Sequence, residues 1–205
     1  MGRWLGVGWC WLFAVGLVSA CAPPALGANC HFPPGETQVA VQLTPAAATN
    51  VPLAFATAAS MNDWNTSRAV NDVPNEGPQF FFGDGPSHLW LDQGELAGGD
   101  IGLFHAEGDQ EHLPTCILGG WRRATITIDW VAVTGFGPLE AARSVLAHEL
   151  GHALGLNEQV DPNTAPPIDN CNVVTVMWPN MDSFTDCGIF RPTAGDVSAV
   201  NQIYN

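Results

Sequence analysis

Residues 138–156 read PLEAARSVLAHELGHALGL and predict the helix from which the rest of the fold can be worked out. Apolar side chains recur along this stretch at spacings of three and four, as on the buried face of a helix; they are Leu139, Ala142, Val145, Leu146 and Leu150. Pro138 suits the first turn of a helix, and Gly155 is placed to end one. We therefore expect a long amphipathic helix.

The same stretch contains a metal-binding pattern, His148-Glu149-Leu150-Gly151-His152. Side chains four residues apart lie on one face of a helix, so both imidazoles can bind one ion. Glu149 can then reach the water that the ion binds. This spacing predicts a zinc site with Glu149 as its general base.

Two histidines alone do not make a catalytic zinc site, because such sites have three protein ligands and an open position for water. If Gly155 takes a left-handed conformation, the chain turns back under the two histidines and brings position 158 within reach of the ion. That residue is Glu158, a suitable ligand, since two His and one Glu also bind zinc in thermolysin-type sites.

This part of the sequence resembles the metzincin metallopeptidases, and within them the matrixins, whose signature HExxHxxGxxH is followed by a methionine-containing turn. Here the chain reads HELGHALGLNE at residues 148–158 and then TVMWP at residues 175–179. Three further features support the resemblance over nearly all of the mature chain: Trp64 with Asn65 at the end of an expected helix, the strand 125–129, and the closing segment PTAGDVSAVNQIY at 192–204.

The resemblance implies an α+β fold and a peptidase activity. It implies a twisted, mostly parallel sheet with one antiparallel edge strand lining the cleft, an active-site helix, and a C-terminal subdomain containing the Met-turn and a closing helix. Zinc would polarise the scissile carbonyl of a protein or peptide substrate, while Glu149 activates the attacking water and protonates the leaving amine. Met177 would be a packing floor beneath the metal, and residues 178–184 would form the wall of the specificity pocket.

The third ligand departs from the family pattern, because Glu158 stands where the matrixins have histidine. An anionic ligand weakens the Lewis acidity of the metal relative to three neutral imidazoles. Asp161 is the alternative ligand, and the register favours Glu158. The departure also leaves open two other functions: a catalytically inert binding module, or a zinc hydrolase acting on a non-peptide bond.

The composition indicates one folded domain and excludes phosphate-rich partners. The chain has 205 residues with 20 acidic and six basic side chains, a formal net charge of −14, and no lysine. Such a surface does not attract nucleic acid. We expect a monomer.

The N-terminus predicts export. Arg3 precedes an apolar run from Trp4 to Val18 that is too short to span a bilayer, so residues 1–20 are interpreted as a signal peptide. Residues 18–21, VSAC, resemble a lipobox that would leave Cys21 lipidated, the only membrane contact expected; cleavage after Ala20 is the alternative. Residues 22–37 are interpreted as a tether, residues 38–205 as the catalytic domain, and the location as extracytoplasmic, either lipid-anchored or secreted.

The remaining cysteines suggest two disulfides in an exported chain. Without Cys10 and Cys21, four are left, and three pairings are possible. We favour Cys171 with Cys187, which are close in sequence, and therefore Cys30 with Cys116. By the resemblance, the former pair would brace the pocket wall; a latency role for Cys30 is the alternative to its pairing.

A second metal site, for calcium or structural zinc, is a weaker expectation for His105, Asp109 and His112 in a glycine- and acid-rich stretch. A solvated loop is the alternative there.

The alternation of apolar residues predicts strands at 38–43, 79–82, 100–104 and 124–130. Helices are expected at 52–64 and from Thr193, where Thr193 and Asp196 form a capping pair, and loops at 83–99 and 157–192.

Overall fold

The computed structural model describes residues 31–32, 35–66, 76–85, 88–106 and 123–204. Its centre is a five-stranded mixed sheet in the order β2-β1-β3-β5-β4. The strands are β1 (Gln38–Leu43), β2 (Gln79–Phe82), β3 (His88–Gln93), β4 (Gly102–Ala106) and β5 (Arg123–Ile128). All neighbouring strands pair in parallel except β4, which runs antiparallel to β5 at one edge. The chain is therefore α+β with a mostly parallel sheet and an antiparallel edge strand, as expected.

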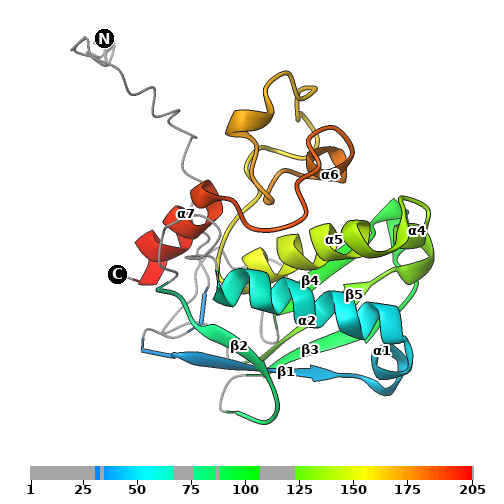
Figure 1. Ribbon diagram of the computed structural model, residues 1–205, viewed down its shortest axis with the longest axis vertical. Coiled ribbons are helices and arrows are strands. Elements are labelled where there is room, and N and C mark those ends of the chain that lie inside the picture. The colour runs from blue at the N-terminus through cyan, green and yellow to red at the C-terminus, as the bar shows by residue number, and fades with distance from the viewer. Residues whose placement is uncertain (1–30, 33–34, 67–75, 86–87, 107–122, 205) are drawn as a thin grey trace, which may run out of the picture.

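Two long helices, α2 (Val51–Asn65) and α5 (Pro138–Ala153), cover one face of this sheet (Figure 1). Each begins as its sequence predicts. Asn50 caps α2 by accepting a hydrogen bond from the Leu53 backbone N–H at 3.1 Å, and Pro138 occupies the first turn of α5. Two shorter helices, α1 (Pro45–Thr49) and α4 (Trp130–Thr134), precede them, and the 3-10 turn η1 (Ala97–Gly99) leads into β4.

Polar contacts lock α2 against α5. The indole N–H of Trp64, which is fully buried, donates to the Ala147 carbonyl at 3.0 Å. Ser60 donates to the Arg143 carbonyl at 3.1 Å, and the Arg143 side chain forms an ion pair with Asp63. The orientation of α5 is thus fixed by hydrogen bonds as well as by the apolar core.

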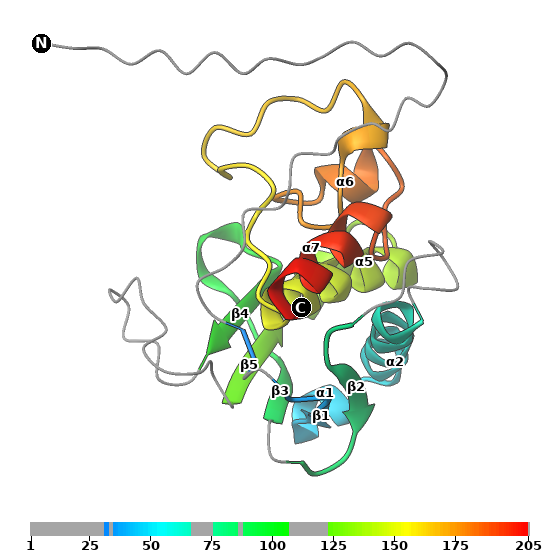
Figure 2. The same cartoon turned by 90° about the vertical axis from the view of Figure 1, so that its left-hand side faces the viewer.

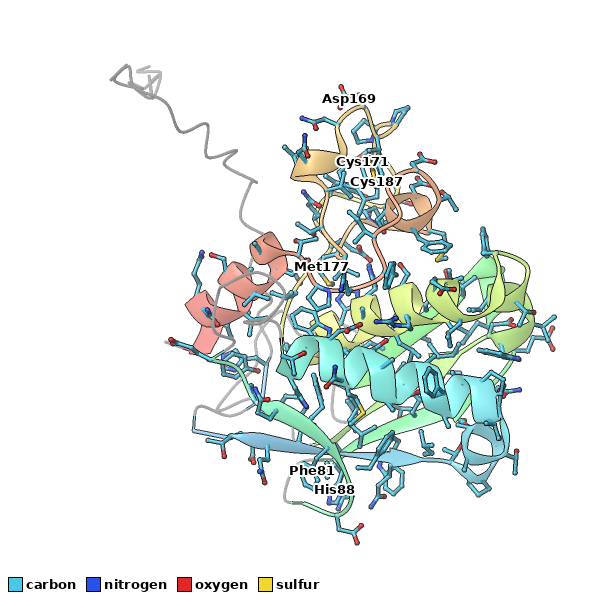
Figure 3. All side chains as sticks on the ribbon, viewed as in Figure 1. Phe81, His88, Asp169, Cys171, Met177 and Cys187 are labelled. Atoms are coloured by element: carbon cyan, nitrogen blue, oxygen red, sulfur yellow. A yellow bond between two sulfur atoms is a disulfide. The ribbon has the colours of Figure 1, made fainter. Side chains whose placement is uncertain are left out.

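The chain after α5 forms a C-terminal layer, most of which lies above that helix in Figures 1 and 2, and it ends in α7 (Ala194–Tyr204). Between them lie only the 3-10 turn η2 (Cys171–Val173) and the short helix α6 (Asp182–Thr185). Cys171 and Cys187 form a disulfide with their Cα atoms 5.4 Å apart, which confirms that predicted pair (Figure 3). Thr193 and Asp196 form the predicted capping pair, because each side chain accepts the other's backbone N–H.

The sequence interpretation was wrong about part of the stretch 83–99, which was expected to be a loop. Residues 88–93 instead form β3, the central strand between β1 and β5. Leu89 and Leu91 are fully buried while Trp90 between them is partly exposed, so the period-two pattern of a strand is present. The neighbouring glycine and aspartate residues are typical of loops, and they led to the wrong interpretation.

Three further boundaries differ from the expected ones. The strand expected at 100–104 is β4, which begins at Gly102 and ends at Ala106. The strand expected at 124–130 ends at Ile128, because Asp129 caps α4 by accepting the Ala132 N–H at 3.0 Å. Phe32, from the stretch interpreted as a tether, is fully buried and belongs to the hydrophobic core.

Several predictions concern residues outside the part of the chain that the structure describes. These are the signal peptide at 1–20, lipidation of Cys21, the Cys30–Cys116 pair, and Asp109 and His112 of the second metal site. Within the described residues, none of the helices is long and apolar enough to cross a membrane.

Candidate metal centre

The two histidines of the motif lie on one face of α5 and both present the same ring nitrogen to a common point. His148 Nδ1 donates to the Val176 carbonyl at 2.9 Å, and His152 Nδ1 donates to the Leu156 carbonyl at 2.8 Å. Backbone carbonyls are common partners of metal-binding imidazoles, because they fix the ring and leave the other nitrogen for the ion. The two Nε2 atoms lie 3.0 Å apart.

Glu158 completes the group, and Gly155 brings it there. Gly155 has φ 94°, the left-handed conformation predicted for the turn after the helix. Glu158 Oε1 then lies 3.2 Å from His148 Nε2 and 3.6 Å from His152 Nε2. These three separations resemble the edges of a zinc tetrahedron, which ligand bonds of about 2.0–2.1 Å place about 3.3 Å apart.

The electrostatics of the group also fit a cation. With both Nδ1 atoms donating to carbonyls, two Nε2 lone pairs face each other at 3.0 Å, an arrangement that needs a proton or a metal ion between them. In addition, Glu158 Oε2 is buried without a hydrogen-bond partner. A divalent ion at this point would bind the two Nε2 lone pairs and compensate the charge of the Glu158 carboxylate. The donor set therefore fits zinc.

The side-chain pKa values describe the same competition between a proton and a metal. Burial alone would lower the pKa of His148, but the hydrogen bond to Glu158 and the negative charge of Glu149 raise it to about 9. Burial of Glu158 opposes its ionisation, but hydrogen bonds from the two histidines lower its pKa to about 2. A metal ion must therefore displace a proton from His148 near neutral pH, so binding releases protons.

Asp161, the alternative third ligand, lies elsewhere. It is exposed and its carboxylate accepts the backbone N–H of Asn163 at 2.9 Å, within a local turn. Among the described residues, the one group of His, Cys, Asp and Glu side chains able to hold a metal consists of His148, His152 and Glu158. His105 of the second expected site is exposed on β4.

Glu149 lies beside the metal ligands and is only 6 % exposed. Burial raises its pKa, opposed by the charges of the two histidines and by a hydrogen bond from the Phe104 backbone N–H. The residue is thus bonded to the edge strand β4 and interacts electrostatically with His148, His152 and Glu158. A carboxyl group with a raised pKa is suited to accept a proton near neutral pH.

A cavity of about 620 Å³ opens in front of these residues. Its walls come from β4, from the face of α5 that includes Val145, His148 and Glu149, and from residues 179–183 after Met177. Residues 178–184 were expected to form the pocket wall, and Pro179, Asn180, Met181, Asp182 and Ser183 do line the cavity. Leu103 and Phe136 line the same cavity and are each 47 % exposed, so the cleft offers apolar surface.

Met177 lies where the C-terminal layer meets α5 (Figure 3). It is fully buried and packs against Gly151, where a Cβ atom would collide with its sulfur. The neighbouring residue Val176 donates its backbone N–H to Asp196 of α7 at 3.1 Å. The turn beneath the histidines is therefore held from both sides.

Sequence reasoning missed the roles of three residues here. Gly151 was named only as part of the motif, although a glycine inside a helix can mark close packing. Asp196 was recognised as a cap and not as the acceptor that also holds Val176. Gly102 carried no signal in the sequence.

Gly102 leaves room for Glu149. A Cβ atom at this position would lie 2.6 Å from Glu149 Oε1 and 2.6 Å from Val145 Cγ1. We expect Gly102→Ala to push the Glu149 carboxylate out of place and to lower kcat by about a hundredfold, the typical effect of a 1 Å misplacement at a reacting centre. His105→Ala, at an exposed position of the same strand that does not line the cavity, is the control for changes in β4.

The measurement is kcat on a cleaved peptide together with bound zinc per chain for both variants. Zinc binding should survive in Gly102→Ala, because Glu149 is not one of the three grouped ligands. Unchanged kcat in that variant would contradict the close approach.

No protein-family model matches this chain, and no curated protein matches it in a sequence search.

Proposed function

We propose that this chain is a zinc-dependent endopeptidase that cleaves extracytoplasmic proteins or peptides. The observation that carries the proposal is the grouping of His148, His152 and Glu158 within 4.8 Å of one another, with buried Glu149 beside them at the wall of an open cavity. Three ligands plus a general base and room for substrate are what metal-assisted hydrolysis requires.

The residues divide the chemical work between them. His148, His152 and Glu158 would hold the zinc ion, which when bound supplies a Lewis acid that polarises a carbonyl and lowers the pKa of water. Glu149 accepts a proton from the attacking water and transfers it to the leaving amine. The raised pKa of Glu149 favours the first transfer, because a carboxylate of higher pKa is a stronger base.

The cleft favours a polypeptide substrate over a small molecule. The antiparallel strand β4 is an edge of the sheet and lines the cavity through residues 102–104. The outer edge of such a strand offers backbone N–H and C=O groups to an extended peptide, which can add as a further strand. A substrate bound in this way would pass directly over Glu149.

The proposal includes a fold family and a cellular location. The antiparallel edge strand, the helix with both histidines and the buried Met177 support a metzincin-type fold, with Glu158 replacing the family's third histidine. The Cys171–Cys187 disulfide supports an oxidising, extracytoplasmic location.

The test is cleavage of casein by the purified chain, with and without 1,10-phenanthroline, alongside zinc analysis of the same sample. We expect about one zinc ion per chain, because the residues that the structure describes contain one group of ligands. Internal cleavage products should be visible by mass spectrometry, vanish with the chelator and return when zinc is added. Stoichiometric zinc without cleavage of casein or of a mixed peptide library would contradict the peptidase assignment and favour an inert module.

A further inference from the structure

The third metal ligand has no helix to hold it. His148 and His152 belong to α5, which ends at Ala153, whereas Glu158 lies in the irregular stretch before η2. A glutamate has more rotatable bonds than a histidine and loses more conformational entropy when it is fixed. The position of Glu158 therefore depends on what holds the backbone beside it.

Gln159 holds that backbone through three hydrogen bonds to one segment, residues 173–177. Its backbone N–H donates to the Met177 carbonyl at 2.7 Å. Its side chain donates through Nε2 to the Val173 carbonyl at 2.7 Å and accepts the Thr175 N–H through Oε1 at 2.8 Å. The backbone next to Glu158 is therefore tied to residues 173–177 by three hydrogen bonds.

The same segment also orients a metal ligand on the helix. The Val176 carbonyl accepts the hydrogen bond from His148 Nδ1, and the Val176 N–H is held by the buried carboxylate of Asp196. One stretch of backbone therefore positions both ligands. It holds His148 on the helix directly, and it holds Glu158 in the loop through Gln159.

We infer that Gln159 is a positioning residue that sets Glu158 at the distance from the two histidines that a metal ion needs. This inference rests on the proposed function, because it concerns the same metal centre. Gln159 touches neither metal nor substrate; it acts by fixing the loop against residues 173–177. Partners that orient metal ligands typically contribute about 10- to 100-fold to metal affinity.

The test compares the Gln159→Met variant with the unaltered chain, both at full length. Methionine is chosen because it keeps the length of the side chain and removes both of its hydrogen bonds. Cobalt(II) serves as the probe, since its visible spectrum reports on the number and geometry of its ligands. We expect the variant to bind cobalt about 10- to 100-fold more weakly, with an altered visible spectrum.

Gln93→Met is the matched control. Gln93 is similarly half-buried, and its side chain accepts a hydrogen bond from Asn50 at 2.7 Å, away from the residues that line the cavity. Urea unfolding in the presence of a chelator measures the purely structural cost of each change. Similar losses of stability in the two variants, with loss of cobalt affinity only in Gln159→Met, would establish the positioning role.

Two results would overturn the inference, and they are distinguishable. If the unaltered chain binds cobalt and Gln159→Met binds it with the same affinity and spectrum, the positioning role is wrong and the peptidase proposal stands. If the unaltered chain binds no metal, the proposed metal centre itself is wrong, and the role of Gln159 falls with it.

Discussion

Replacing Glu149 by glutamine should abolish peptide cleavage and leave zinc in place. The amide has nearly the shape of the carboxylate but cannot accept the proton of the attacking water, and general base catalysis of this kind contributes about 10²–10⁴-fold. Zinc should remain because the three grouped ligands, His148, His152 and Glu158, are unchanged. The measurement is kcat/KM on one peptide, with bound zinc determined on the same preparation.

Glu140→Gln is the control for this prediction. Glu140 lies in the first turn of the same helix and is exposed, so the same chemical change there should alter neither quantity. Zinc-loaded Glu149→Gln that cleaves at the rate of the unaltered chain would show that another group acts as the base. Loss of zinc in that variant would mean that Glu149 is itself a ligand or supports one.

Removing the charge of Glu149 should also raise stability, because its carboxylate is buried. Desolvation is the largest influence on its pKa and disfavours the ionised form. Functional groups held in such unfavourable surroundings commonly lower the stability of an enzyme. A variant that is more stable and inactive would therefore agree with a catalytic role.

The parts of the site that follow from short-range spacing could be predicted from the sequence. The positions of His148 and His152 on one helical face depend only on a separation of four residues. The turn at Gly155 depends on one residue that tolerates positive φ, and it has φ 94°. Both rules act within a few residues of the chain, so no knowledge of the tertiary structure is needed.

The parts that depend on long-range packing could not be predicted in this way. Strand β3 is stabilised by parallel pairing with β1 and β5, and neither partner is joined to it by a short turn. Its sequence, HLWLDQ, lacks β-branched residues, so propensity gave little indication of a strand. The residues 88–93 form a strand because Leu89 and Leu91 become buried in the core when the sheet assembles.

The support of the metal ligands is also a long-range property. His148 is oriented by a carbonyl 28 residues further along the chain, and Gln159 bonds to residues 14 and 16 positions away. No periodicity relates these positions. The sequence identifies the candidate ligands and the candidate base, because few residue types can fill these roles, whereas any backbone carbonyl can serve as their partner.

Glu158→Gln should remove zinc from the chain and activity with it. The Glu158 carboxylate supplies one of three ligand atoms and the only negative charge among them. Losing a residue that merely orients a ligand costs about 10- to 100-fold in metal affinity, so losing a ligand should cost more than about a hundredfold. Competition with a chromophoric chelator would measure the affinity, and Glu158→His should restore it by supplying a third neutral imidazole.

Asp161→Asn decides whether the correct carboxylate has been identified. It makes the same change from carboxylate to amide three residues further on, at an exposed side chain that bonds to Asn163. We expect full zinc affinity in Asp161→Asn and loss in Glu158→Gln. The reverse result would mean that the loop after Gly155 closes in another register. Because Gln159 fixes the present register through its bonds to residues 173–177, that result would contradict its positioning role as well.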